Sequence, residues 1–298
     1  MNPHTPTPHP HRDNQFQSSI VRRGGARVAA RNQGSREQSA NDRSDAREAG
    51  SEPISIVLPT FNEVETVPGV IEELQDQLVR EHETIVVDDD SPDGTPEVVD
   101  ELWSDDPRVR VVKRTDESGL ASAVLRGIRE AKHEAVVVLD ADGQHPPSIV
   151  PSLVAELERG SDVVVGSRHA GGAIESEWSR TRYALSFGAS LLAWAAIPDA
   201  RPLQDPMSGC FAVRRNVVAS VDGRLEPQGF KILLEILAVA PIDEVAEVPL
   251  YFEPRGSGES NMDTDEVRSY IRHLARLARV SRQKQRPQRA RSAAEVSD

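Results

Sequence analysis

Ala135-Val136-Val137-Val138-Leu139-Asp140-Ala141-Asp142-Gly143-Gln144 joins a short, unbroken apolar run to an acidic segment that follows it directly. An apolar run without alternation is typical of a strand buried on both faces of a parallel sheet. Similar runs, rich in β-branched residues, occur at residues 54–58, 84–87, 109–112 and 162–165. The sequence therefore predicts a mostly parallel sheet built from these strands.

Helical patterns lie between the runs. Apolar residues recur at helical spacing from Val64 to Leu78, and the same periodicity occurs at residues 120–131 and 149–157. Strands that alternate with helices form α/β folds in which helices cover both faces of the sheet. The predicted fold class is thus a Rossmann-like α/β fold.

The later part of the body has weaker patterns. Residues 179–197 form an amphipathic stretch rich in small residues, residues 230–239 read as a helix and residues 245–252 read as a strand. Residues 254–264 are rich in Gly and Ser and lack periodicity, which predicts a mobile loop.

The two ends of the chain differ from its body. Residues 1–50 lack apolar periodicity and are predicted to be a disordered tail, so the body is assigned to residues 51–264. Residues 265–282 are predicted to form a basic amphipathic helix, followed by a second disordered tail at residues 283–298. The helix places four arginines on one stripe: Arg268, Arg272, Arg276 and Arg279. Two interpretations stay open, an interfacial helix attracted to anionic lipid or a surface helix packed on the sheet.

Composition limits the classes of protein that fit. The net charge is −13 and the chain has only four lysines, a pattern typical of halophilic proteins, although an ordinary acidic protein from a GC-rich genome also fits. The single cysteine, Cys210, cannot form an internal disulfide, and we expect a cytoplasmic protein. The longest mostly apolar stretch, residues 184–198, is too short to cross a bilayer, so no transmembrane segment is predicted.

Acidic residues follow three of the predicted strands, in segments 59–63, 88–94 and 140–147. The carboxyl ends of parallel strands share one edge of a sheet, where ligands bind. Clustered carboxylates are costly unless a cation or hydrogen-bond donors neutralise them. In an extended backbone Asp140, Asp142 and Gln144 point to one side, and such oxygen ligands suit Mg²⁺ or Mn²⁺. The alternative is that these acidic residues only decorate a halophilic surface.

Several motifs together resemble one known enzyme family. They are Pro59-Thr60-Phe61-Asn62-Glu63, Val87-Asp88-Asp89-Asp90-Ser91-Pro92-Asp93-Gly94-Thr95, Asp140 to Pro147, Gly166-Ser167-Arg168, Asp205-Pro206-Met207-Ser208-Gly209 and Arg255-Gly256-Ser257-Gly258-Glu259-Ser260. In this order, over residues 54–280, they resemble the dolichyl-phosphate mannose synthases, which are family-2 glycosyltransferases of the GT-A fold. Phe61, Gly143 and Asn261 depart from the family's usual residues, as does Ser118.

The resemblance implies roles for individual residues. The nucleotide-sugar donor is expected at Pro59, Phe61, Glu63, Val86, Asp88 and Asp90, with Arg255 closing a loop over its diphosphate. The metal is expected at Asp140, Asp142 and Gln144, with transfer depending on Asp142. The lipid phosphate is expected at Arg168, Arg182 and Ser186, although Arg168 also reads as a structural ion pair. For Lys231 a phosphate contact and a snorkelling surface lysine both remain open.

The implied function is inverting transfer of mannose from GDP-mannose to dolichyl or polyprenyl phosphate. The enzyme is expected to be peripheral on the cytoplasmic face of the membrane, and a membrane-anchoring subunit is a further possible partner. Two alternatives remain: a UDP-glucose-dependent dolichyl-phosphate glucosyltransferase, and a catalytically idle nucleotide-binding partner subunit. Nucleic acid is not an expected partner, because the basic ends lack interleaved aromatic residues and the acidic body repels the polymer.

Overall fold

The computed structural model describes residues 19–22, 52–170, 180–227, 231–251 and 264–295. Eight strands form one mixed sheet in the order β1-β8-β6-β7-β5-β2-β3-β4. Their bounds are β1 Ser19–Arg22, β2 Ile54–Thr60, β3 His82–Asp88, β4 Val109–Lys113, β5 Ala135–Val138, β6 Val163–Ser167, β7 Phe211–Arg214 and β8 Glu244–Pro249. The parallel pairs are β2 with β3, β2 with β5, β3 with β4 and β6 with β8. The predicted α/β fold with a mostly parallel sheet is confirmed.

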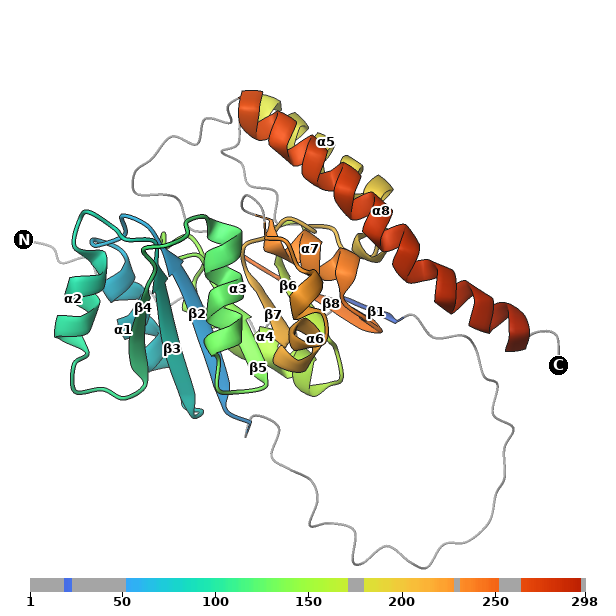
Figure 1. Cartoon of the computed structure of the whole chain (residues 1–298). Coiled ribbons are helices and arrows are strands. Elements are labelled where there is room, and N and C mark those ends of the chain that lie inside the picture. The colour runs from blue at the N-terminus through green and yellow to red at the C-terminus, as the bar shows by residue number, and fades with distance from the viewer. Residues whose placement is uncertain (1–18, 23–51, 171–179, 228–230, 252–263, 296–298) are drawn as a thin grey trace, which may run out of the picture.

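Helices cover both faces of this sheet (Figure 1). Their bounds are α1 Val67–Gln77, α2 Thr95–Leu102, α3 Leu120–Glu130, α4 Val150–Glu158, α5 Arg180–Ala196, α6 Arg215–Ala219, α7 Ile232–Val239 and α8 Thr264–Glu295. Successive side chains of a strand point to opposite faces. In β2, Ile56 and Leu58 accordingly pack in the core that contains α1 and α4, whereas Val57 packs in the core that contains α3 and α7. Unbroken apolar strands therefore serve two cores at once.

Strand β7 gives the sheet a feature that the sequence pattern did not show. It lies between β5 and β6 and is antiparallel to both. The segment that leads into β7, residues 205–210, therefore lies beside the carboxyl end of β5, where Asp140 follows. This reversal brings a loop from the second half of the chain to the acidic edge.

Two elements differ from the predicted bounds. Helix α8 extends past Arg282 to Glu295. Residues 283–295 contain many good helix formers, such as Ala, Arg and Gln, although they lack the apolar stripe on which the prediction depended. Near the N-terminus, β1 forms within the segment predicted to be disordered, where it pairs with the otherwise unpaired edge of β8. The predicted mobile loop at 254–264 lies almost wholly outside the described residues.

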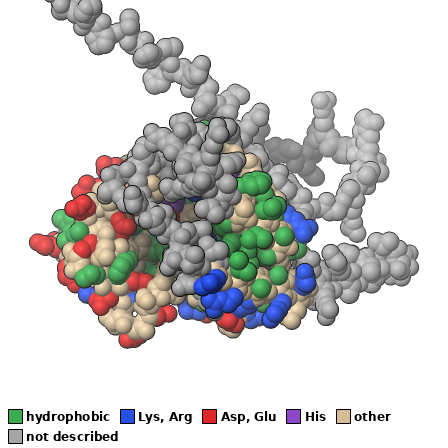
Figure 2. All heavy atoms as spheres, turned by 90° about the horizontal axis from the view of Figure 1, so that it is seen from above, with side chains coloured by type: hydrophobic (Ala, Val, Ile, Leu, Met, Phe, Trp, Pro, Cys, Tyr) green, Lys and Arg blue, Asp and Glu red, His purple; other side chains and the backbone are tan. Residues whose placement is uncertain are grey.

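The surface divides into regions of different character. Seen from above, acidic side chains gather over one end of the molecule, whereas apolar, Lys and Arg side chains gather at the other (Figure 2). Among the described residues, no helix is both long and apolar enough to cross a membrane.

Candidate functional site

Three acidic segments meet at one edge of the sheet. Strands β2 and β3 pair in parallel up to Thr60 opposite Asp88, and β2 pairs on its other side with β5. Residues 61–63, 89–94 and 140–147 leave these strands at their carboxyl ends. The parallel register, rather than any contact visible in the sequence, brings the segments together.

Asp88 is a buried structural carboxylate at this edge, with no exposed area. Its Oδ2 accepts hydrogen bonds from the Thr60 hydroxyl (2.8 Å) and the Ser91 hydroxyl (2.6 Å), and its Oδ1 accepts one from the Ser91 backbone N–H (2.8 Å). Buried carboxylates require such partners because desolvation penalises the charge. Asp88 therefore joins the ends of β2 and β3 and shapes the loop after β3.

The next two aspartates are held by cations on β4 and just after it. Asp89 forms an ion pair with the buried Arg114 (3.0 Å) and accepts a hydrogen bond from the Gly119 N–H (2.6 Å). Asp90 is exposed, has a φ of 58° and forms an ion pair with Lys113 (3.2 Å). Asp89 and Arg114 were not predicted as site residues, although the run of three aspartates was a signal. Of the three, Asp90 is the one that presents its carboxylate to solvent.

The segment after β2 combines an exposed ring with a fixed backbone. The side chain of Phe61 is 57% exposed, which is unusual for a large apolar residue. Asn62 has a φ of 60°, and its N–H donates to the Ser91 hydroxyl (3.0 Å). The Glu63 carboxylate accepts a hydrogen bond from Thr66 (2.6 Å). The ring of Phe61 is therefore exposed next to a loop that hydrogen bonds hold in place. It offers a flat surface on which an aromatic base can stack.

Pro59 and Val86 are buried within β2 and β3. Of the residues predicted for the nucleotide, Phe61 and Asp90 are exposed and Glu63 is partly exposed, whereas Pro59, Val86 and Asp88 form the floor. The buried three can act on a donor only through the loops that they support.

The segment after β5 is held by its own polar groups. The Asp140 N–H donates to His145 Nδ1 (3.1 Å), which places the ring proton on Nε2. The Gln144 N–H donates to Asp142 Oδ1 (3.0 Å), and Gly143 between them has a φ of 73°. Glycine adopts this left-handed conformation at little cost. His145, which belongs to the motif from Asp140 to Pro147, orients this segment through Nδ1.

Gly209 fixes the position of the Asp140 carboxylate. A Cβ at residue 209 would lie 2.2 Å from Asp140 Oδ2 and 2.8 Å from its Cγ. Real Cβ atoms do not approach so closely, so only glycine admits the carboxylate at this point. Gly209 belongs to the sequence motif that begins at Asp205, but its contact with Asp140 depends on the reversal of β7.

Within the described residues, no group of three or more His, Cys, Asp or Glu side chains is arranged to hold a metal ion. Mg²⁺ is usually held by only one or two carboxylates, with waters and substrate phosphates as its remaining ligands. Asp140 and Asp142, both partly exposed, match that smaller requirement.

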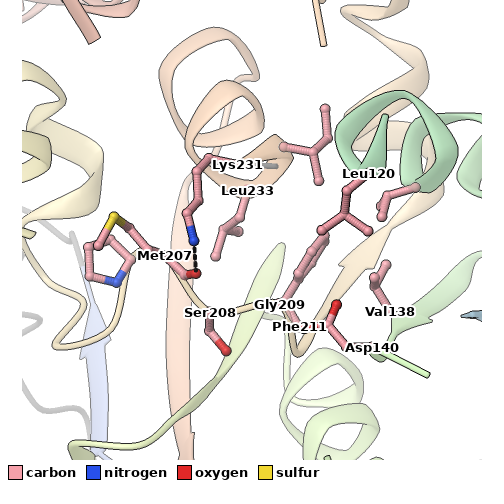
Figure 3. A pocket seen from close by; sticks show the side chains of 12 residues that line it. Leu120, Val138, Asp140, Met207, Ser208, Gly209, Phe211, Lys231 and Leu233 are labelled. Carbon is pink, nitrogen blue, oxygen red and sulfur yellow. Dashed lines mark hydrogen bonds between the residues drawn. The ribbon is translucent and has the colours of Figure 1, made fainter. Parts of the chain in front are cut away.

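A small hollow lies beneath the acidic edge, between β5, β7 and the start of α7 (Figure 3). Its volume is about 20 Å³, enough for about one water molecule, and its lining is mostly apolar apart from Asp140, Ser208 and Lys231. Lys231 Nζ donates to the Met207 carbonyl oxygen (3.2 Å). Burial, together with the nearby Arg168 charge, lowers the pKa of Lys231. Lys231 is thus held inside the site rather than snorkelling at the surface.

Arg168 is paired with a buried carboxylate. Its Nε and Nη2 donate to the two oxygens of Asp205 at 2.7 and 3.0 Å. Burial raises the pKa of Asp205, but the hydrogen bond and charge of Arg168 outweigh it, so the pKa is lowered overall. The structural ion pair considered for Arg168 is therefore present, and it occupies one edge of the guanidinium.

Glu247 on β8 supports the same loop. Its Oε1 accepts hydrogen bonds from the Gln204 N–H (2.8 Å) and the Asp205 N–H (3.0 Å). Burial raises the pKa of Glu247 above its ordinary value. Glu247 was not predicted from the sequence, because its role depends on a contact between β8 and a distant loop.

The remaining candidates cannot be placed. Arg255 lies outside the described residues. Arg182 and Ser186 belong to α5, whose backbone is described there, but their side chains lie outside the described part.

Comparison with known proteins places this geometry among sugar-transferring enzymes. Residues 55–221 match the model of glycosyl transferase family 2. The dolichol-phosphate mannosyltransferase of Pyrococcus furiosus is 42% identical over 75% of this chain, and the match covers 63% of that relative, which is less than two thirds of its length. The enzyme of the same name from Saccharomyces cerevisiae is 36% identical over 74% of this chain and 85% of the relative. The undecaprenyl-phosphate mannosyltransferase of Micrococcus luteus is 33% identical over 74% of this chain and 91% of the relative.

Solved structures show the same fold. Glucosyl-3-phosphoglycerate synthase from Mycobacterium tuberculosis, solved with Mn²⁺, UDP-glucose and phosphoglyceric acid, matches with a TM-score of 0.57 and 24% identity. The match covers 76% of this chain and 80% of that one. The architecture is that of the GT-A glycosyltransferases.

Proposed function

Because this chain belongs to glycosyl transferase family 2, we propose that it transfers mannose from GDP-mannose to dolichyl or another polyprenyl phosphate. Relatives named as dolichol-phosphate and undecaprenyl-phosphate mannosyltransferases support both the sugar and the class of acceptor. The observation that carries the proposal is the meeting of Phe61, Asp90, Asp140 and Asp142 at the carboxyl edge of β2, β3 and β5.

The donor diphosphate needs positive charge at this acidic edge. We propose that Asp140, Asp142 and Gln144 hold Mg²⁺ or Mn²⁺ together with the diphosphate, a ligand set that such ions accept. When bound, the ion would neutralise the charge that develops on the departing nucleoside diphosphate. The Mn²⁺ and UDP-glucose bound together in the mycobacterial synthase support this arrangement. Phe61 stacks on the base, and Glu63 and Asp90 bind the rest of the nucleoside.

The reaction is a single in-line displacement at the anomeric carbon. The acceptor phosphate is largely a dianion near neutral pH, because its second pKa is about 6. It therefore attacks without a strong general base. His145 is therefore not needed as a base, and its Nδ1 already accepts the Asp140 N–H. The chain's own task is to orient the two substrates and to exclude water.

The acceptor phosphate is assigned to arginines on the β6 and α5 side. Arg182 and Ser186 stay as proposed ligands from the family resemblance, and Arg255 as the residue that closes over the donor. Arg168 has one edge fixed by Asp205, which sets the plane of its guanidinium. We propose that Arg168 orients the loop that contains Asp205 and attracts the acceptor phosphate electrostatically.

The acceptor is a lipid, so the enzyme must meet a membrane surface. Helices α5 and α8 lie side by side (Figure 1) and are tied by a hydrogen bond from the Tyr270 hydroxyl to the Ala189 carbonyl oxygen. Their outer face exposes large apolar side chains, namely Phe187, Leu191, Leu192 and Ile271. Exposed arginines flank them on α8, namely Arg268, Arg272 and Arg279. We define these seven residues as the α5–α8 face, which lies in the apolar and basic region of Figure 2.

The inner side of α8 is packed on the body of the protein. Leu274 and Leu277 are buried, and Arg276 forms an ion pair with the buried Glu235 of α7 (2.8 Å). The two interpretations of this helix therefore combine: one side packs, and the other side is apolar and basic. Apolar area and arginine charge together favour an anionic membrane surface, and we propose that this surface is the cytoplasmic face. A membrane-anchoring subunit stays as a possible partner.

The test of function supplies donor and acceptor together. Purified protein with Mg²⁺ or Mn²⁺ and dolichyl phosphate receives labelled GDP-mannose or labelled UDP-glucose in parallel. Label from GDP-mannose in the organic phase is the expected result. Label from UDP-glucose alone would establish the glucosyltransferase alternative. No label from either donor, with folded protein and an active control enzyme, would leave the catalytically idle subunit.

Membrane binding is tested separately by sedimentation with vesicles of phosphatidylserine and phosphatidylcholine. Each basic residue near an anionic surface contributes about 1 kcal/mol, so Arg272→Glu is expected to weaken binding roughly tenfold. Arg224→Glu, an exposed arginine after α6, is the matched charge control and is expected to bind normally. Equal loss in both variants would show a response to net charge, not to the α5–α8 face.

A further inference from the structure

The two lateral edges of the sheet, along β4 on one side and along β8 on the other, are protected in different ways. Edge strands with unpaired backbone groups invite pairing with other chains, and inserted charges discourage it. Strand β4 carries Arg110 and Lys113, which form ion pairs with Glu83 (3.3 Å) and Asp90 (3.2 Å). This edge is therefore charged along its own length.

Strand β8 carries no such pair of basic residues. Its sequence, Glu-Val-Ala-Glu-Val-Pro, contains no lysine or arginine, and Val245, Ala246 and Val248 are buried. Its second acidic residue, Glu247, is turned inward, where it holds the N–H groups of Gln204 and Asp205. An uncovered β8 edge would expose the row of backbone N–H and C=O groups that now pairs with β1, and such a row is a template for pairing with another strand.

The structure places a strand of the same chain on this edge. Residues Ser19–Arg22 form β1, antiparallel to β8, with Ser19 opposite Glu247 and Arg22 opposite Glu244 (Figure 1). Strand β1 lies before the region that matches the family, which begins at residue 55. Both β1 and β8 lie outside that region, which ends at residue 221.

We propose that residues 19–22 are a built-in edge strand that closes β8 against pairing with a second molecule. The occupant is the chain's own segment because residues 23–53 join β1 to β2 in the same molecule. A tethered segment acts at an effective concentration that reaches the millimolar range, which a free second copy rarely matches. Own-segment pairing therefore outcompetes pairing between molecules.

The cover also lies next to the acceptor side of the candidate site. Ser19 pairs opposite Glu247, whose carboxylate supports Asp205, and Asp205 holds Arg168. A strand from another molecule added at β8 would therefore pair with the same strand whose Glu247 supports Asp205 and, through it, Arg168. The pairing of β1 with β8 does not depend on the proposed reaction.

The test compares two truncations of the otherwise complete chain. Deletion of residues 1–22 removes β1, and deletion of residues 1–16 keeps it as the matched control. Hydrogen exchange is measured over β8 and over β2, which serves as an internal reference in the middle of the sheet. Sedimentation velocity at several protein concentrations reports the oligomeric state of both chains.

In the chain that lacks residues 1–22, we expect hydrogen exchange at alternate amides of β8 to accelerate by at least about tenfold. Exchange in β2, and in the chain that lacks only residues 1–16, should be unchanged. If the bared edges pair instead, the shorter chain forms a concentration-dependent dimer while the control stays monomeric, which also supports the proposal. Unchanged exchange and unchanged mass in both chains would overturn it. A dimer of the complete chain that is lost on removal of β1 would overturn it too, because β1 would then cover the edge of a second copy.

A double substitution tests the same contact without shortening the chain. Successive N–H groups of a strand point to opposite sides, so either Ile20 or Val21 donates toward β8. Ile20→Pro with Val21→Pro removes both donors, and it should reproduce the effect of the longer deletion. Normal β8 exchange in this variant would contradict the pairing.

Discussion

Gly209 offers the sharpest test of the candidate metal site, because a side chain at this position would be placed against Asp140. Gly209→Ala puts a Cβ 2.2 Å from Oδ2, 2.8 Å from Oδ1 and 2.8 Å from Cγ of that carboxylate. An ordinary contact begins near 3.4 Å. The carboxylate must therefore retreat by about 1 Å, since the backbone of β7 is fixed on both sides by β5 and β6.

The size of the effect follows from that displacement. A catalytic group that is misplaced by about 1 Å loses on the order of a hundredfold in rate. We therefore expect kcat/KM to fall about a hundredfold, which corresponds to about 2.7 kcal/mol of transition-state stabilisation. The added methyl group also strains the packing, at a cost of about 1–3 kcal/mol in the free energy of unfolding.

The assay must separate misplacement of Asp140 from strain. Mn²⁺ binding in the presence of GDP-mannose is measured by electron paramagnetic resonance of the free ion, and label transfer to dolichyl phosphate is measured over a range of Mn²⁺ concentrations. Gly127→Ala is the matched control, because its Cβ would lie 2.3 Å from Val57 Cγ1 in the middle of the sheet. It should lose stability but keep its affinity for Mn²⁺.

Either of two results would refute this reasoning. Gly209→Ala with normal Mn²⁺ affinity and normal transfer would show that Asp140 does not need its present position. Equal loss of Mn²⁺ affinity in Gly127→Ala would show that general strain, rather than the contact with Asp140, is responsible.

Three further predictions concern single side chains. Asp142→Ala is expected to abolish label transfer and leave the circular dichroism spectrum unchanged; a fully active variant would contradict the metal assignment. Arg276→Ala leaves the buried Glu235 carboxylate without its guanidinium, so urea denaturation should show a loss of about 3 kcal/mol in the free energy of unfolding, and a loss near zero would contradict the role of this pair. Asp106 accepts hydrogen bonds from Arg108, which lower its pKa from 3.8 to about 2. Since the folded pKa is below the ordinary one, this pair stabilises above about pH 4 and the benefit is lost as the pH falls toward 2. The difference in melting temperature from Asp106→Asn should shrink over that range, and a constant difference would contradict the shift.

The local sequence was enough to predict the fold class and the position of the acidic edge. Unbroken apolar runs such as residues 135–139 identify strands that are buried on both faces, and their alternation with helical patterns identifies a parallel sheet. Parallel strands carry the residues after them to a common edge, so the amino-acid order alone groups Asp140 with the aspartates after β3. These features depend on near neighbours in the chain.

Contacts between distant segments could not be predicted in this way. The burial of Asp88, the bidentate pairing of Arg168 with Asp205, and the support of that pair by Glu247 all depend on which strands become neighbours. So does the pairing of β1 with β8, because a four-residue strand has little signal of its own and is stabilised by an edge elsewhere in the sheet.

The sequence by itself thus determined the alternation of strands and helices, the family resemblance and the chemistry available at the strand ends. Only the tertiary structure decided which carboxylates face solvent and which are buried and paired with other groups of the protein. The physical reason is that a side chain's role depends on its desolvation and its partners, and both are set by long-range packing. Asp140 illustrates this, since its residue type is read directly from the sequence but its position is set by Gly209, sixty-nine residues away.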